Sequence, residues 1–112
     1  MRRKLLLGAG VVVALAAAAV GTQALPSARA RRTYEHGIVL ADAGDHAAAI
    51  RAFGDAATMD HRLTSIAYTR MGGSYLKLGQ KYQAIVCLRH ALELDPANVN
   101  ASVMLTRAVR SY

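Results

Sequence analysis

The chain has 112 residues, with 14 lysines and arginines against 7 aspartates and glutamates, and a formal net charge of +7. This length leaves room for one domain, and the single cysteine, Cys87, excludes a disulfide bond within the chain. The basic surplus favours acidic partners or an anionic surface, although Arg2, Arg3 and Lys4 supply three of the charges.

The chain begins with a hydrophobic segment. Residues 5–21 carry no polar side chain and follow the basic Arg2-Arg3-Lys4. A helix of these residues is about 25 Å long at about 1.5 Å per residue, slightly short of a hydrocarbon core of about 30 Å, and residues 22–25 complete the span. We therefore expect residues 1–25 to form a hydrophobic helix that is either a transmembrane anchor or a signal peptide.

The end of this segment leaves its processing open. Ala28-Arg29-Ala30 and Thr22-Gln23-Ala24 both have the small-x-small form of a cleavage site. An uncleaved segment predicts a single-pass membrane protein with the remaining chain on the non-cytoplasmic side, periplasmic or extracellular, and a cleaved one predicts export. Residues 26–32, with three arginines, are expected to form a basic linker that either contacts anionic headgroups or is a solvated connector.

Two later stretches carry the same pattern, offset by 35 residues. In each stretch, apolar or small residues line one face of a helix with 3.6 residues per turn. Gly37 and Gly72, and Gly44 and Gly79, are separated by the same offset. Self-similarity of this kind indicates a helical array. The two sets are Ala49, Ile50, Phe53, Ala56 and Ala57, then Ala84, Ile85, Leu88, Ala91 and Leu92.

Further positions of both copies fit a known repeat pattern. In the later copy, residues 65–98, the matching positions are Tyr68, Met71, Gly72, Tyr75, Gly79, Ala84, Leu88, Ala91 and the ending Leu92-Glu93-Leu94-Asp95-Pro96. The earlier copy, residues 30–64, keeps Gly37, Leu40, Gly44, Ala49, Phe53 and Ala56. It departs from the pattern at Thr33 and His61, where an aromatic residue and a proline are usual. These residues resemble the tetratricopeptide repeat.

The resemblance implies an all-α fold, a short array of helical hairpins over residues 33–112, preceded by the N-terminal hydrophobic helix. The array contains two repeats and a C-terminal capping helix over residues 99–112, because one further amphipathic stripe follows the second copy. Two hairpins and a cap form a small core, so we expect marginal stability that a partner, or association into a homo-oligomer, would increase. The stripe consists of Ala101, Met104, Leu105, Ala108 and Val109.

Local signals predict the turns and close contacts of the array. Gly44 and Gly79 suit the left-handed conformation just past a helix end, and Asn98 suits the N-cap of the last helix. Helices approach closely where facing side chains are small. The expected close pairs are Gly37 with Ala49, and Gly72 with Ala84.

In the tetratricopeptide family, the first helices of successive repeats line a concave groove that binds a peptide. The resemblance places basic and apolar side chains there, which suits an acidic and hydrophobic segment of a partner protein. Members that clamp a C-terminal carboxylate use lysine and asparagine at positions held here by Tyr34, Ile38, Thr69 and Gly73, so that ligand is not expected. The alternative for each basic residue is a solvated helix face. The candidate groove residues are Arg31, Tyr34, Ile38, Thr69, Arg70, Gly73, Lys77, Val103, Arg107 and Arg110.

Other kinds of site find little support in the sequence. Cys87 and His90 fall on one helical turn, but two ligands do not make a zinc site. We find no phosphate loop, nucleophile elbow or dinucleotide motif, so we expect no enzyme activity and no cofactor. The sequence favours a non-enzymatic interaction module at the cell envelope. The alternative is electrostatic binding of anionic lipid or nucleic acid, of which nucleic acid is the less expected because no aromatic platform is evident.

Overall fold

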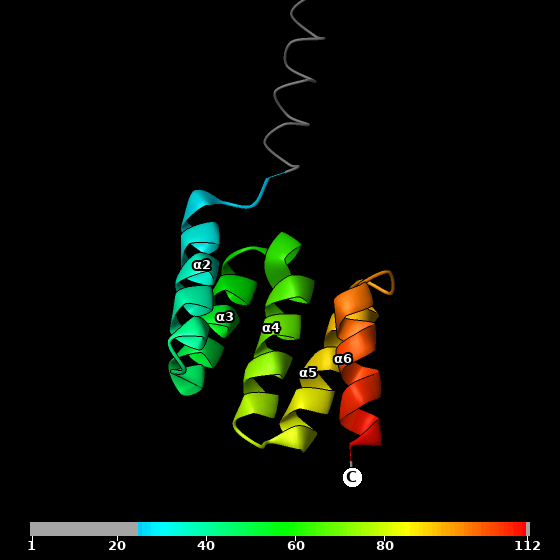
Figure 1. The fold of residues 1–112 in the computed structure, drawn as a ribbon. Helices are drawn as coiled ribbons and strands as arrows, with labels where there is room; N and C mark the ends of the chain where they lie inside the picture. The colour runs from blue at the N-terminus through cyan, green and yellow to red at the C-terminus, as the bar shows by residue number, and fades with distance from the viewer. Residues whose placement is uncertain (1–24, 112) are drawn as a thin grey trace, which may run out of the picture.

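The structure, a computed structural model, describes residues 25–111, and this part of the chain is entirely helical (Figure 1). No strand occurs within these residues, as the all-α prediction requires. The predicted hydrophobic helix lies almost wholly in residues 1–24, outside the described part. No helix between residues 25 and 111 combines the length and apolar character needed to cross a membrane. The elements are α2 (Ala28–Asp42), α3 (His46–Met59), the 3-10 helix η1 (His61–Leu63), α4 (Thr64–Lys77), α5 (Lys81–Leu94) and α6 (Val99–Arg110).

The helices form two hairpins and a final helix, stacked in chain order. α2 pairs with α3 and α4 pairs with α5, while α3 also packs against α4 and so joins the hairpins. α6 packs on α5 and, less extensively, on α4. Figure 1 shows the helices side by side from α2 to α6, with alternating chain directions. The paired helices expected from the repeated pattern are therefore present.

Each hairpin closes through a glycine that faces a large apolar side chain. A Cβ atom added to Gly37 would lie 2.7 Å from Cε1 of Phe53, and one added to Gly72 would lie 2.7 Å from Cγ of Leu88. The expected pairs with Ala49 and Ala84 are thus not the closest contacts. The Ala84 carbonyl oxygen would lie 3.4 Å from a Cβ atom added to Gly72. The reason is that the large side chain, one turn further along the second helix, fills the space above the glycine.

The turns within the hairpins have the predicted left-handed glycines. Gly44 has φ of 87° and Gly79 has φ of 73°. The Gly44 amide donates to the Ala41 carbonyl and the Asp45 amide donates to the Leu40 carbonyl, which is a Schellman motif. Gly79 ends α4 with the same pair of hydrogen bonds.

The core is built from small side chains with a few large ones between them. Phe53 and Leu88 are the largest fully buried side chains of the described residues. Phe53 packs with Ala49 and Ala57 of its own helix and with Ala67 of α4, so one cluster spans both hairpins. A second cluster joins Leu88 and Ala91 to Ala101 of α6.

Asn98 begins α6, as predicted, and also holds it to α4. Its Oδ1 accepts the Ala101 amide at 3.0 Å. Its Nδ2 donates to Ser65 Oγ and to Thr69 Oγ1, both at 2.9 Å. The N-cap therefore fixes both the start and the position of the last helix.

The basic segment before the array is shorter than the linker expected over residues 26–32. α2 begins at Ala28, and Ser27 caps it by accepting the Ala30 amide at 3.1 Å. Residues 28–32 are therefore helical, and their arginines belong to the first hairpin.

Candidate functional site

The candidate groove residues belong to α2, α4 and α6, and the structure brings most of them together in two pockets. We name these the α2/α4 pocket and the α4/α6 pocket after the helices that contribute the candidate residues. Arg70 lines both. The pockets are therefore adjacent parts of one surface.

The α2/α4 pocket has an apolar floor and a polar rim. Ile38, Ala41 and Phe53 supply the apolar side, while Arg70 and Lys77 supply the cations. Its volume is about 190 Å³, below the roughly 300 Å³ at which small-molecule sites usually begin. The pocket therefore suits a side chain of a larger ligand. The full lining is Ile38, Ala41, Asp42, His46, Phe53, Arg70, Gly73, Ser74 and Lys77.

One polar atom at this pocket has no partner. Nδ1 of His46 is buried and makes no hydrogen bond within residues 25–111. Buried polar atoms are usually satisfied, because leaving one unpaired costs free energy. His46 also begins α3, so it stands where α2, α3 and the pocket meet.

Arg70 is held in place by the first hairpin. Its Nε donates to Tyr34 Oη at 3.2 Å, across 36 positions of sequence. Tyr34 in turn packs its ring on Phe53, with ring centroids 5.6 Å apart. The hydrogen bond to Tyr34 orients the guanidinium and leaves its two terminal nitrogens for a ligand, the geometry that pairs with carboxylates.

The α4/α6 pocket is wider, with a volume of about 460 Å³. Val103 and Met104 form its apolar part, and Arg70 and Arg107 its basic part. No acidic side chain lines it. Thr69 and Asn100 complete the lining.

Several predicted residues have other roles or lie apart. Thr69 is buried, and its hydroxyl donates to the Ser65 carbonyl while accepting from Asn98, so it holds α6 in place. Gly73 makes room for Met104, since an added Cβ would lie 3.0 Å from Cε of that side chain. Neither Arg31 nor Arg110 lines a pocket.

The pockets also include residues that the sequence did not indicate. Asp42 and His46 flank the turn of the first hairpin, and Phe53 belongs to a second helix that the family pattern assigns to packing. Ser74, Asn100 and Met104 fall one turn or less from predicted positions. Helical spacing from Arg70 and Val103 would have indicated Ser74 and Asn100. The position of His46 at the pocket could be found only from the three-dimensional structure.

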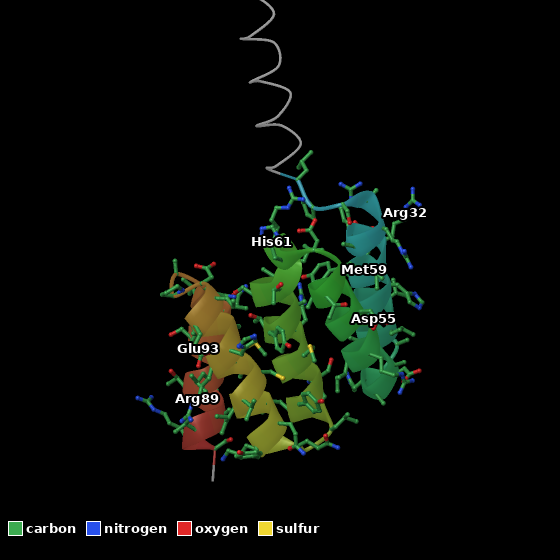
Figure 2. The ribbon with its side chains drawn as sticks, turned by 180° about the vertical axis from the view of Figure 1, so that it is seen from behind. Arg32, Asp55, Met59, His61, Arg89 and Glu93 are labelled. Atoms are coloured by element: carbon green, nitrogen blue, oxygen red, sulfur yellow. The ribbon has the colours of Figure 1, made fainter. Side chains whose placement is uncertain are left out.

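A third hollow lies on α4 and α5, away from the candidate groove residues. Tyr68 and His90 meet there with ring centroids 4.5 Å apart, and His90 pairs with Glu93 at 3.6 Å. Figure 2 shows Arg89 and Glu93 from this side. Cys87 is buried, and burial raises the pKa of its thiol. Within residues 25–111 no three His, Cys, Asp or Glu side chains gather at a metal-binding distance.

The fold is thus a helical-hairpin array with a pocketed face on α2, α4 and α6. Residues 65–98, which cover α4, α5 and the turns around them, match the family model of the tetratricopeptide repeat. The chain therefore carries a tetratricopeptide repeat at these residues, which supports the resemblance found in the sequence. Repeats of this family generally form protein-protein interaction modules, and the match supports that class of function here. No curated protein matches the chain.

Proposed function

We propose that this protein binds an acidic and hydrophobic segment of a partner protein across the α2/α4 and α4/α6 pockets. The observation that carries the proposal is the position of Arg70, which lines both pockets and is oriented by Tyr34. A carboxylate bound there would lie between two apolar hollows. In this proposal the protein is an interaction module without a catalytic role.

The charges around the pockets favour an acidic ligand. Within the described chain, Lys77 and Arg107 have no recorded ion pair, and Arg70 bonds only to a neutral phenol. Asp42 is the one carboxylate that lines either pocket. Opposite charge on the ligand would speed association and fix its register.

The apolar parts favour side-chain anchors on the same ligand. Ile38 and Ala41 at one pocket and Val103 and Met104 at the other present hydrophobic surface. Val103 remains 43% exposed. Covering such surface contributes roughly 25 cal/mol per Å² before the costs of association.

We propose further that the hydrophobic N-terminal segment places the module at a membrane. Its residues 5–21 lack polar side chains and follow three basic residues. Retained, the segment would anchor the pocketed array on the non-cytoplasmic side, and cleaved it would export the array. Digestion of the array by external protease in intact spheroplasts is the expected result, and an array that is left intact would contradict this orientation.

Affinity capture after crosslinking in cells tests the groove. We compare the natural protein with Arg70→Glu plus Lys77→Glu, and with Arg51→Glu plus Arg89→Glu as a control of equal charge change on α3 and α5. A discrete protein partner lost only from the first variant supports the proposal. Equal capture by all three proteins contradicts it.

The same experiment separates the electrostatic alternative. Nucleic acid or lipid that is captured by the natural protein, shed at high salt and lost equally from both variants would indicate general electrostatic binding. The pockets would then have no specific ligand.

A further inference from the structure

The end of the array where α2 begins carries a cluster of cations. Arg29, Arg31 and Arg32 lie in the first turns of α2, and all three are exposed. Arg62 of η1 lies at the same end, because η1 follows the end of α3 and α3 runs antiparallel to α2. We name these four arginines the basic end.

A buried carboxylate fixes the basic end to the fold. Asp60 is 6% exposed, and its Oδ2 accepts the Ser27 amide at 2.7 Å, across 33 positions of sequence. The same carboxylate accepts the Arg62 amide at 2.9 Å and the Arg62 Nε and Nη2 at 3.0 Å each. The start of α2 and the turn between the hairpins are therefore joined by the Asp60 carboxylate, and the arginines of α2 belong to the helical fold.

Arg62 is paired with Asp60, but part of the remaining charge is not neutralised within residues 25–111. The structure records no ion pair for the side chains of Arg29 and Arg32 within residues 25–111. Arg31 pairs with Glu35 at 4.0 Å, with both side chains more than half exposed, so solvent weakens that pair. Glu93 and Asp95 lie at the C-terminal end of α5, which packs on α4 and α6 rather than on α2.

Apolar side chains accompany the cations. Leu25 is 62% exposed and Met59, at the end of α3, is 39% exposed. Figure 2 shows Arg32, Met59 and His61 toward the end of the array at which α2 begins. Cations beside exposed apolar groups suit the boundary between lipid headgroups and acyl chains.

We propose that the basic end rests on a membrane surface and binds anionic lipid headgroups. Lipid is the expected ligand because the α2 arginines of the basic end lie close in sequence to the apolar segment of residues 5–21. Only a short stretch, residues 22–24, separates that segment from Leu25. A segment of that composition belongs in a bilayer, so the first turn of α2 is held within reach of the headgroups. The phosphate groups of the lipid headgroups then supply negative charge to the arginines of the basic end that have no recorded ion pair within residues 25–111. The pocketed face of α2, α4 and α6 stays free, since it lies along the helices rather than at their end.

The test measures how close each end of the array lies to lipid. Full-length protein with Met59→Cys or Leu78→Cys carries a donor fluorophore and is reconstituted into vesicles with acceptor-labelled headgroups. Leu78 is 42% exposed and lies past the end of α4, at the opposite end of the array. Native Cys87 is buried with a raised pKa, so it reacts slowly at neutral pH.

Two lipid compositions separate tethering from headgroup binding. Vesicles of phosphatidylcholine alone report tethering, and equal parts of phosphatidylcholine and phosphatidylglycerol add the anionic headgroup. We expect the anionic lipid to increase energy transfer from the Met59 position but not from the Leu78 position. Equal energy transfer in both lipids overturns the proposal. The same result is expected if the basic end binds nucleic acid or a protein instead.

Matched charge variants locate the effect. Arg29→Gln plus Arg32→Gln should abolish the anionic increase, whereas Arg51→Gln plus Arg89→Gln, with the same loss of charge on α3 and α5, should keep it. If the full chain stays in solution, flotation with the same vesicles replaces energy transfer, and binding should fall about fivefold per arginine in the first variant only. Equal loss in both variants would overturn the proposal, because net charge alone would then explain binding.

Discussion

Single glycines decide how closely the helices of each hairpin approach. Gly37 and Gly72 occupy equivalent positions, and each would bring a Cβ atom within 2.7 Å of a buried side chain. By contrast Gly54, in the middle of α3, would place its Cβ 3.9 Å from Met71 Cε, an ordinary contact. The same substitution should therefore have opposite effects at different glycines.

Gly72→Ala should destabilise the protein by about 1 to 3 kcal/mol, because the new methyl group overpacks against Leu88. Gly54→Ala should be neutral or stabilise by up to about 1 kcal/mol, since alanine favours the helix and its methyl group makes only an ordinary contact with Met71. Unfolding free energies from urea titration measure both. Similar effects of the two substitutions would mean that the close contact with Leu88 has no energetic role.

At the scale of the elements, side-chain caps set where helices start. Asp45 caps α3 with a single hydrogen bond from the Ala48 amide, at 3.2 Å, on an exposed turn. Asn98 caps α6 and also bonds to two hydroxyl groups of α4. α6 has no hairpin partner within the described chain, so this cap contributes to its docking as well as to its start.

Asn98→Ala should cost about 2 to 3 kcal/mol, because it removes the cap and leaves two partly buried hydroxyls without their donor. Asp45→Ala, which removes a cap alone, should cost about 1 kcal/mol. Hydrogen exchange should show early loss of amide protection in α6 for the first variant and not for the second. Unchanged protection of α6 would refute the docking role of Asn98.

For the whole molecule, the carboxyl group of Asp60, which lies where the two hairpins join, makes the folding stability depend on pH in the acidic range. The Arg62 side chain, followed by the Arg62 and Ser27 amides, holds the pKa of this carboxyl well below its ordinary value of 3.8. The unfolded chain therefore takes up a proton at a higher pH than the folded chain does. The stability from Asp60 is complete above the ordinary pKa and is lost as the pH falls below it toward the lower folded pKa.

Asp60→Asn should lower stability at neutral pH and reduce the further loss that the natural protein shows from about pH 4 downward. Asp55→Asn, at an exposed carboxyl on α3, is the control and should keep the natural acid profile. Chemical unfolding at a series of pH values measures these profiles. If the Asp60→Asn protein loses as much stability at low pH as the natural protein does, groups other than Asp60 dominate that loss.

The sequence alone predicted the local features of the fold. Helical spacing, the left-handed turns at Gly44 and Gly79 and the cap at Asn98 all depend on neighbours a few positions away. Such features are encoded by short-range sterics and hydrogen bonding, so a residue pattern is enough to indicate them. The candidate groove residues, by contrast, came from the family resemblance.

Tertiary structure decided which of those residues meet. The bond from Arg70 to Tyr34, the pairing of glycines with Phe53 and Leu88, and the place of His46 at a pocket each depend on how one helix rests on another. The bond from Ser27 to Asp60 crosses 33 positions and turned an expected linker into part of the fold. Contacts between distant residues depend on the stacking of whole helices and on side-chain volume, and neither is a property of any short stretch of sequence.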